Sequence, residues 1–256
     1  MPELRVTALH RYPVKGFSPE RLDACTLEAG AYFPGDRLFA VENGPSGFDP
    51  AAPVHQPKIK FLMLMRDEAL ARLRTRYDDA TGKLDVHEGG RAALVADLGT
   101  AEGRLALEAF LRRSVPASLR GPPKVLATAR EDFRFTDSPR GFVSLLNLAS
   151  VAAIEDFVGA PVDPLRFRAN LHLDGLQPWS ELDLVGREFT APSGVRLRVT
   201  KRTQRCAATN VDPATGIRDL AIPKALVQRL GHADCGVYAE VLAGGRLAEG
   251  DALAPA

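Results

Sequence analysis

The apolar residues of this chain occur in short runs separated by turn-forming residues, and this spacing is the feature that most restricts its fold. Leu4–Tyr12 alternates loosely between apolar and polar side chains, as a half-buried strand does. Similar strands are expected at 22–27, 36–41, 83–87, 143–146, 186–190, 196–202 and 237–242. Helices are expected only at 67–76, 101–113, 150–158 and 223–230. Many short strands with few helices predict a mixed, β-rich fold, in which helices pack outside a barrel.

Residues that end helices and strands mark further boundaries in the sequence. Ser150 is expected to cap its helix, and Pro223 and Gly231 are expected to open and close the last one. Breaks follow the second helix at Ser114-Val115-Pro116 and at Gly121-Pro122-Pro123. We therefore divide the chain into a first region, 1–117, and a second region, 118–256.

Composition excludes several kinds of partner. The 256 residues carry a formal net charge of +1, so no overall field draws the protein to nucleic acid or to an anionic membrane. The longest apolar runs, such as Phe61–Met65, are far shorter than the roughly 18 residues that a spanning helix needs. The N-terminus does not have the charge and apolar pattern of a signal peptide. We expect a cytoplasmic protein with neither nucleic acid nor membrane as a partner.

The three cysteines are too irregularly spaced for a disulfide framework or a zinc ribbon, and each must be judged alone. Cys25 and Cys235 have no clustered cations nearby and are interpreted as structural. Cys206 follows a predicted strand, close to Lys201, Arg202 and Arg205. Nearby cations stabilise a thiolate, which is the ligand that thiophilic metals prefer. An alternative of equal weight is that the cations are solvated and Cys206 is a small core residue.

Other polar groups gain weight only together. Arg166 and Arg168 are two residues apart, so in an extended segment they share one face, and with Asn170 they could form a pocket of donors. The alternative is an ordinary surface strand. Lys15-Gly16 offers a charge beside a backbone that a ligand can approach closely. Arg37 is unremarkable alone, and the five histidines are too scattered to suggest a zinc site.

Taken in order, these residues resemble the MOSC proteins, named after the C-terminal domain of molybdenum cofactor sulfurase. The resemblance covers nearly the whole chain, and the nearest members are similar to the amidoxime-reducing component and its bacterial relatives. It rests on Tyr12–Gly16, Gly35–Val41, Phe167–Asn170, Arg205–Gly216 and Gly250–Asp251. It implies a MOSC-type β-barrel with peripheral helices at 118–256, and an N-terminal β-barrel-like or α+β half at 1–117.

The resemblance also implies a molybdenum cofactor, the metal bound to a pterin known as molybdopterin, with Cys206 as the catalytic residue and metal ligand. Carried over onto this sequence, the residues that would hold the pterin and its phosphate include charged and amide groups of the motifs. A hydroxyl-bearing segment near the cofactor would fall within 144–150. The candidates are Lys15, Gly16, Arg37, Asn147, Ser150, Arg168, Asn170, Arg205 and Tyr238. Position 16 is a departure, because eukaryotic members carry Ser there.

The function that this resemblance implies is the reduction of small N-hydroxylated compounds. The chain has no cysteines for an iron–sulfur domain of its own, so electrons would come from a separate flavin or iron–sulfur protein. An alternative is a carrier that holds the cofactor, or sulfur as a persulfide on Cys206, for delivery to another protein. A third possibility is a barrel that has lost its cofactor, against which the intact Cys206, Arg168 and Asn170 argue.

Overall fold

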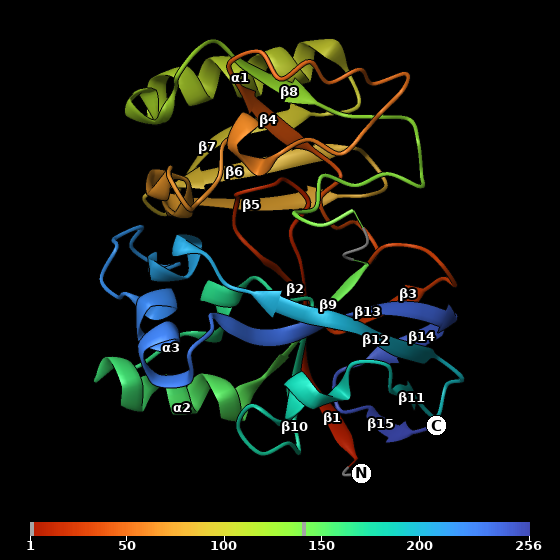
Figure 1. Ribbon diagram of the computed structural model, residues 1–256. Helices are drawn as coiled ribbons and strands as arrows, with labels where there is room; N and C mark the ends of the chain where they lie inside the picture. Colours follow the sequence, from red (N-terminus) through yellow and green to blue (C-terminus); the bar gives the residue numbers. More distant parts are fainter. Residues whose placement is uncertain (1–2, 140–141) are drawn as a thin grey trace.

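The computed structural model describes residues 3–139 and 142–256, which form two stacked lobes (Figure 1). The lower lobe in this view holds most of the strands together with α2 (Leu148–Val158) and α3 (Ile222–Leu230). The upper lobe holds β4 to β8 and α1 (Ala101–Ser114). Among the described residues, no helix is both long and apolar enough to cross a bilayer.

Seven strands of the lower lobe close into a barrel, which confirms the predicted β-rich fold. Around the ring they are β1 (Leu4–Arg11), β10 (Leu171–Asp174), β9 (Val143–Asn147), β13 (Asp234–Ala243), β12 (Arg196–Gln204), β11 (Glu188–Thr190) and β15 (Ala252–Pro255), which pairs with β1 again. All pairs are antiparallel except β9 with β10. Alternate residues point inward, so Leu197 and Val199 of β12 join the core while Arg196 and Arg198 face solvent.

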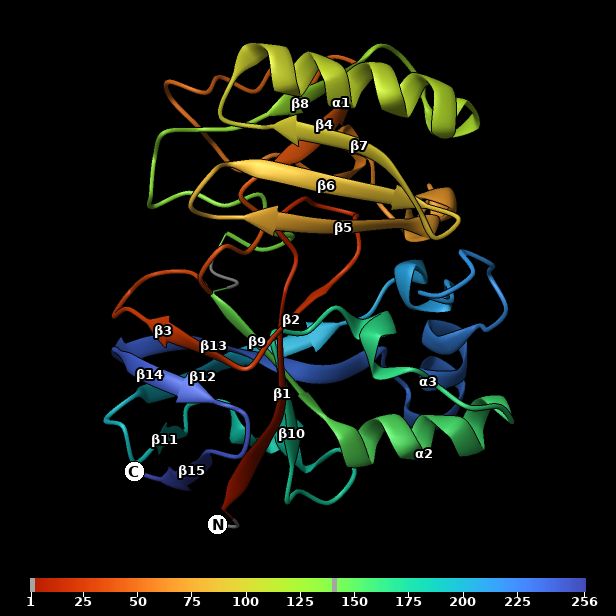
Figure 2. The same ribbon diagram turned by 180° about the vertical axis from the view of Figure 1, so that it is seen from behind.

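The upper lobe is built around a meander of three antiparallel strands, β5 (Leu73–Asp78), β6 (Lys83–Glu88) and β7 (Arg91–Asp97). A second pair, β4 (Ala40–Asn43) with β8 (Pro123–Leu126), lies beside α1, which crosses the outer side of this lobe (Figure 2). The side chain of Thr100 caps α1 by accepting a 3.0 Å hydrogen bond from the amide of Gly103. The buried apolar faces of these elements form a second core.

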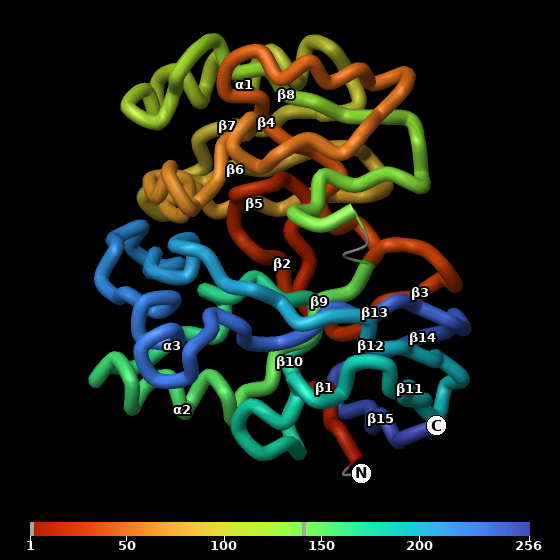
Figure 3. The backbone as a smooth tube through the Cα atoms, in the orientation of Figure 1, coloured from red at the N-terminus to blue at the C-terminus, as the bar shows by residue number. Residues whose placement is uncertain are grey.

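The chain passes between the lobes more than once. β2 (Glu20–Leu22) pairs with β1 at the junction, and β3 (Ala24–Leu27) pairs with β14 (Gly245–Ala248) beside the barrel (Figure 3). β2 and β3, which precede residue 117, thus belong to the lower lobe, whereas β8, which follows it, belongs to the upper lobe. The division at 117/118 stays a prediction about the sequence, and the spatial lobes do not follow it strand for strand.

Two helices pack outside the barrel, as expected. α2 and α3 share a third core that includes Ile154 and Leu226. The prediction for α3 is confirmed, since a proline lies in its first turn and Gly231 ends it with a φ of 80°. Ser150 is not the cap of α2: that role belongs to Asn147, whose Oδ1 accepts from the amide of Ala149 at 3.1 Å.

The helix expected at 67–76 is wrong. Only Glu68–Arg72 forms a short 3₁₀ helix, and β5 begins at Leu73. From there Leu73 and Thr75 are buried while Arg74 and Arg76 are exposed, and this period of two suits a strand paired with β6. The strand expected at 36–41 also begins late, at Ala40, because the left-handed φ of 49° at Arg37 is incompatible with extended backbone.

Candidate functional site

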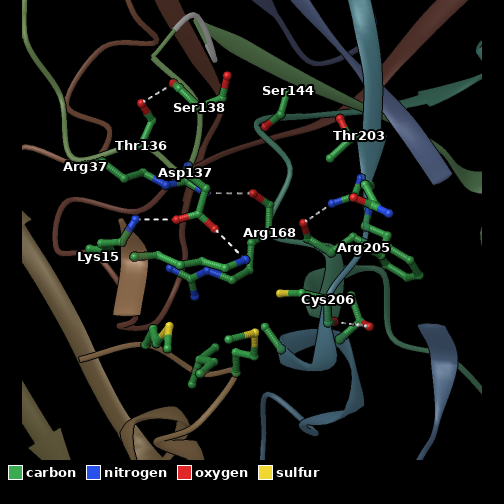
Figure 4. Close-up of a pocket in the computed structure, with 18 of the residues that line it drawn as sticks. Lys15, Arg37, Thr136, Asp137, Ser138, Ser144, Arg168, Thr203, Arg205 and Cys206 are labelled. Carbon is green, nitrogen blue, oxygen red and sulfur yellow. Dashed lines mark hydrogen bonds and ion pairs between the residues drawn. The ribbon is translucent and has the colours of Figure 1, made fainter. Parts of the chain in front are cut away.

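A cavity of about 390 Å³ lies at the junction of the two lobes (Figure 4). The barrel lobe contributes Cys206 and its neighbours to the wall. The apolar segment 63–65, whose Leu64 belongs to the core of the upper lobe, forms another part of it. Of the residues predicted for the site, eight line this cavity: Lys15, Gly16, Arg37, Arg168, Asn170, Arg205, Cys206 and Tyr238. Residues far apart in the sequence therefore meet in one place.

Cys206 lies just beyond β12, before the short 3₁₀ helix Ala207–Asn210, and its sulfur points into the cavity (Figure 4). Its carbonyl oxygen accepts from both the amide and the hydroxyl of Thr209, at 3.1 and 3.0 Å. These bonds fix the backbone of the turn and leave the thiol free of any role in it. The half-buried side chain is available to a ligand.

Arg166 secures the segment that carries Cys206 rather than facing a ligand. Its buried guanidinium donates two bonds of 2.7 Å to the carboxylate of Asp219 and one of 3.2 Å to the carbonyl of Asn210. It also reaches Asp212 at 3.3 Å. Asp212 accepts from the amides at 214 and 215, which confirms the predicted Asp-Pro turn. Because both of its Nη atoms are held by these partners, Arg166 is a positioning residue.

Arg218 ties the same segment to the upper lobe. Its guanidinium donates to the carbonyl of Ala207 at 3.0 Å and to the carbonyl of Leu64 at 2.8 Å. The second bond joins the lobes directly beside Cys206. The apolar stretch 63–65 is thereby held alongside the cysteine segment as one wall of the cavity.

Arg37 and Arg168 form the most constrained part of the wall. Both have left-handed backbone, with φ of 49° and 54°, a conformation that costs energy for residues other than glycine. Their guanidinium carbons lie 4.4 and 4.3 Å from the centre of the buried Tyr12 ring. Arg37 also pairs with Asp36, and Arg168 donates to the carbonyl of Phe17 at 2.6 Å. Strained residues held this firmly are typical of functional sites.

The pKa values of Arg168 and of the Tyr12 ring show how burial affects this part of the wall. Burial, aided by the charge of Arg37, lowers the pKa of Arg168 to about 10. Burial raises the pKa of Tyr12 to about 12, so the ring between them stays neutral. Arg168 is still protonated at neutral pH, and among the described residues no carboxylate lies within ion-pairing distance of it. A bound anion would offset the free-energy cost of burying the Arg168 charge without a partner.

The buried Lys15 pairs with Asp137, whose side chain is 47% exposed, at the same side of the cavity (Figure 4). The Lys15 ammonium donates to the Asp137 carboxylate and, at 2.9 Å, to the carbonyl of Phe135. Burial lowers the pKa of Lys15. Burial opposes the charge of Asp137, yet Lys15 and Lys58 together hold its pKa well below the ordinary value. Gly16 has a φ of 84°, and a Cβ there would lie 3.0 Å from the carbonyl oxygen of Leu62.

Asn170 lines the cavity but serves mainly as a clamp. Its Oδ1 accepts from the amide and hydroxyl of Ser144, at 3.0 and 2.8 Å, and its Nδ2 donates to the carbonyl of His10 at 3.1 Å. These bonds join β9 to β1 two residues from Arg168. The expected pocket of free donors therefore lacks the Asn170 amide, which instead fixes the backbone that presents Arg168.

Two predicted site residues do not reach the cavity, and this corrects the expectation for them. Asn147 caps α2 and donates to Glu181 at 2.9 Å, while the Ser150 hydroxyl donates to the same carboxylate at 2.8 Å. Both side chains are buried behind the barrel strand and their polar atoms are occupied. Within the segment 144–150 it is Ser144 whose hydroxyl lies at the cavity.

The cavity has a large surplus of positive charge, although the whole chain has a net charge of only +1. Eight of its residues are Lys or Arg and two are Asp. Within 3–139 and 142–256, no carboxylate pairs with Arg168, Lys201 or Arg205. The Nη2 of Arg205 and the hydroxyl of Thr203 are buried there without a hydrogen-bond partner. Such donors beside a thiol suit a ligand that carries phosphate and a soft metal.

Sequence reasoning missed two residues of the site and noticed a third only in part. Asp137 lies in a loop and Lys58 begins a short 3₁₀ helix, and the fold brings both to the cavity that Cys206 lines. Lys201 was seen only as part of the charge cluster around the cysteine; its ammonium bonds to Ser138 and lies 5.2 Å from the centre of the Tyr238 ring. The Asp-Ser-Pro stretch at 137–139 was the one signal that could have drawn attention to Asp137.

The closed barrel, the second lobe and the cysteine-lined cavity between them define a class of two-lobed β-barrel proteins with a cationic site at the junction. The chain belongs to the MOSC family: residues 132–254 match the MOSC domain, and residues 3–118 match the MOSC N-terminal beta barrel domain. This confirms the resemblance inferred from the motifs. The family is associated with the molybdenum cofactor.

Two solved structures are similar to the chain. The YuaD protein from Bacillus subtilis is 13% identical over 99% of this chain and 97% of that one, with a TM-score of 0.47. YiiM from Geobacillus stearothermophilus is 22% identical over 46% of this chain and 55% of that one, with a TM-score of 0.37. No curated protein matches the sequence.

Proposed function

We propose that the protein is a molybdenum-cofactor-binding oxidoreductase that reduces N-hydroxylated compounds. The observation that carries the proposal is the placement of the Cys206 sulfur in a cavity whose cations lack enough carboxylates to neutralise them. In this proposal Cys206 is the metal ligand. Arg168, Arg205 and Lys201 hold the phosphate and pterin, with Lys15, Arg37 and Tyr238 completing the wall.

The reaction consumes two electrons and two protons, breaks the N–O bond of the substrate and releases the oxygen as water. The bound molybdenum cofactor supplies the two-electron chemistry. A separate flavin or iron–sulfur protein is the proposed electron donor. The chain itself orients the cofactor: Arg166 and Asp219 hold the cysteine segment, and Arg218 holds the apolar wall against it.

Molybdenum content is the first test. Protein made in a host with an active cofactor pathway is expected to hold close to one molybdenum per chain, and Cys206→Ser is expected to lose it. Cys25→Ser is the matched control, because Cys25 lies on β3 paired with Leu247, away from the cavity. Absence of molybdenum from the wild type, beside a loaded control protein from the same host, would reject the proposal.

Turnover separates the reductase from a carrier that uses the same cavity. Loaded protein is mixed with benzamidoxime and an artificial electron donor, and the product is followed over many equivalents. Steady formation of benzamidine supports the enzyme. Loss of cofactor or sulfur to an acceptor protein in a single stoichiometric round, without turnover, supports the carrier.

A further inference from the structure

Lys58 occupies a distinctive place at the cavity. It begins the short 3₁₀ helix Lys58–Lys60, and its ammonium lies 3.6 Å from the Asp137 carboxylate. The side chain is 31% exposed, whereas that of Lys15, on the same carboxylate, is 8% exposed. Lys58 is therefore the more accessible of the two lysines that contact this carboxylate.

Lys58 lines the same cavity as Cys206, the residue at which chemistry is proposed. Its ammonium therefore adds positive charge to the wall that surrounds the Cys206 sulfur.

Three cations of the wall have closer carboxylate partners: Arg37 pairs with Asp36, Lys15 with Asp137, and Arg166 with Asp219. Arg168, Lys201 and Arg205 are assigned to the cofactor in the proposed function. Lys58 has only a longer contact to a carboxylate that Lys15 already engages. Its charge is therefore incompletely neutralised, and a group that approaches Cys206 from solvent meets it.

We propose that Lys58 makes the Cys206 side of the cavity selective for anions, and that the substrate is an N-hydroxylated compound with a carboxylate near its N–O group. The substrate part of this inference rests on the proposed function, whereas the anion selectivity belongs to the chain itself. Lys58 is then a specificity-determining residue. The apolar wall at 63–65 would receive the uncharged part of the same molecule.

Alkylation of Cys206 in cofactor-free protein tests the selectivity without any turnover. Iodoacetate is anionic and iodoacetamide is neutral, but the same thiolate attacks the CH2 carbon of each and displaces iodide, so the ratio of the two rates cancels the fraction of thiolate present. Mass spectrometry of the Cys206 peptide separates this site from Cys25 and Cys235. Loss of one charge a few ångströms away is expected to lower the ratio about fivefold in Lys58→Met.

Lys60→Met is the matched control, because Lys60 ends the same short helix and is not among the described residues that line the cavity. Its ratio is expected to equal that of the wild type. Thermal melting of both variants verifies that each remains folded. An unchanged ratio in a folded Lys58→Met variant would overturn the proposal.

The substrate class is tested on loaded protein with benzamidoxime and its carboxylated analogue. The KM of the carboxylated compound is expected to rise about fivefold in Lys58→Met, with little change for the neutral one. Equal effects on both compounds would overturn the carboxylate assignment. If the wild type binds no molybdenum or gives no turnover, the proposed function fails, while the alkylation ratio still decides the role of Lys58.

Discussion

The guanidinium of Arg37 donates a 3.0 Å hydrogen bond to the main-chain carbonyl of Arg168, a residue 131 positions further along the chain. Arg37 leads into β4 of the upper lobe, and Arg168 leads into β10 of the barrel. Both have left-handed backbone. Neither side of this contact is preformed by local structure, so the site exists only when both lobes are folded together.

The planar guanidinium of Arg168 is expected to contribute more to cofactor retention than its positive charge alone. Arg168→Lys keeps a cation but loses the planar group over Tyr12 and the bond to the Phe17 carbonyl. Loss of one charge-assisted hydrogen bond predicts roughly tenfold weaker retention of cofactor. The measurement is the rate of molybdenum release during dialysis, with the Arg187→Lys variant as a control outside the cavity. Equal rates in both variants would contradict the role assigned to Arg168.

Gly16→Ala is expected to destabilise the protein by about 1–3 kcal/mol. The φ of 84° disfavours any Cβ, and the new atom would also lie 3.0 Å from the Leu62 carbonyl oxygen and 3.3 Å from Leu70. Gly30→Ala is the control, since Gly30 has a φ of 72° but open space around a Cβ. Urea denaturation measures the difference, and a smaller loss for Gly16→Ala than for Gly30→Ala would contradict the steric argument.

Asp219→Asn is expected to loosen the segment that carries Cys206. It removes the charge from the carboxylate that accepts two bonds from the buried Arg166, at a cost of about 1–3 kcal/mol. Hydrogen exchange across residues 206–219 should become faster. Asp183→Asn, in an exposed pair with Arg202, serves as the control and should leave that exchange unchanged. Unaltered exchange in Asp219→Asn would show that other contacts hold the segment.

Stability is expected to fall in mild acid because of two buried histidines. The rings of His10 and His172 lie 4.7 Å apart. Burial, followed by the charge of Arg21, lowers the pKa of His10 to about 4; burial, followed by His10, lowers the pKa of His172 to about 3. Between the ordinary value near 6.5 and these lowered values, the unfolded chain binds more protons than the folded one.

The free energy of unfolding should therefore be highest above pH ~6.5 and decrease as the pH falls toward about 4. His172→Leu should flatten this decrease, whereas His87→Leu, at an exposed position of β6, should not. Urea titrations at several pH values measure the slope. A decrease as steep in His172→Leu as in the wild type would assign the acid sensitivity to other groups.

The sequence predicted the parts of the site that depend on local motifs. Cys206, Arg168 and Lys15 lie in such motifs, and the structure brings all three to one cavity. Lys58 and Asp137 belong to no motif, because their role comes from contacts with residues distant in the sequence. The hydrogen-bonding capacity of a side chain also did not suffice to predict whether it is free to bind a ligand.

Asn170, Asn147 and Ser150 illustrate the reason. Each side chain has the right chemistry for a ligand, but each satisfies a buried neighbour instead. Competition between internal and external partners is decided by packing, which a motif does not encode. The same holds for β5, where tertiary pairing with β6 overrode a helical spacing of apolar residues.

The pairing of Leu4 with Leu253 in β1 and β15 has a consequence for how the protein is made. β1 must wait for β15, which follows all other strands of the ring in the sequence, before the ring can close. Until then the barrel has two open edges, while the meander of β5 to β7 is already complete and able to fold on the ribosome. The nascent chain thus carries a complete meander and an unclosed sheet, which makes late synthesis the stage most exposed to aggregation and to help from chaperones.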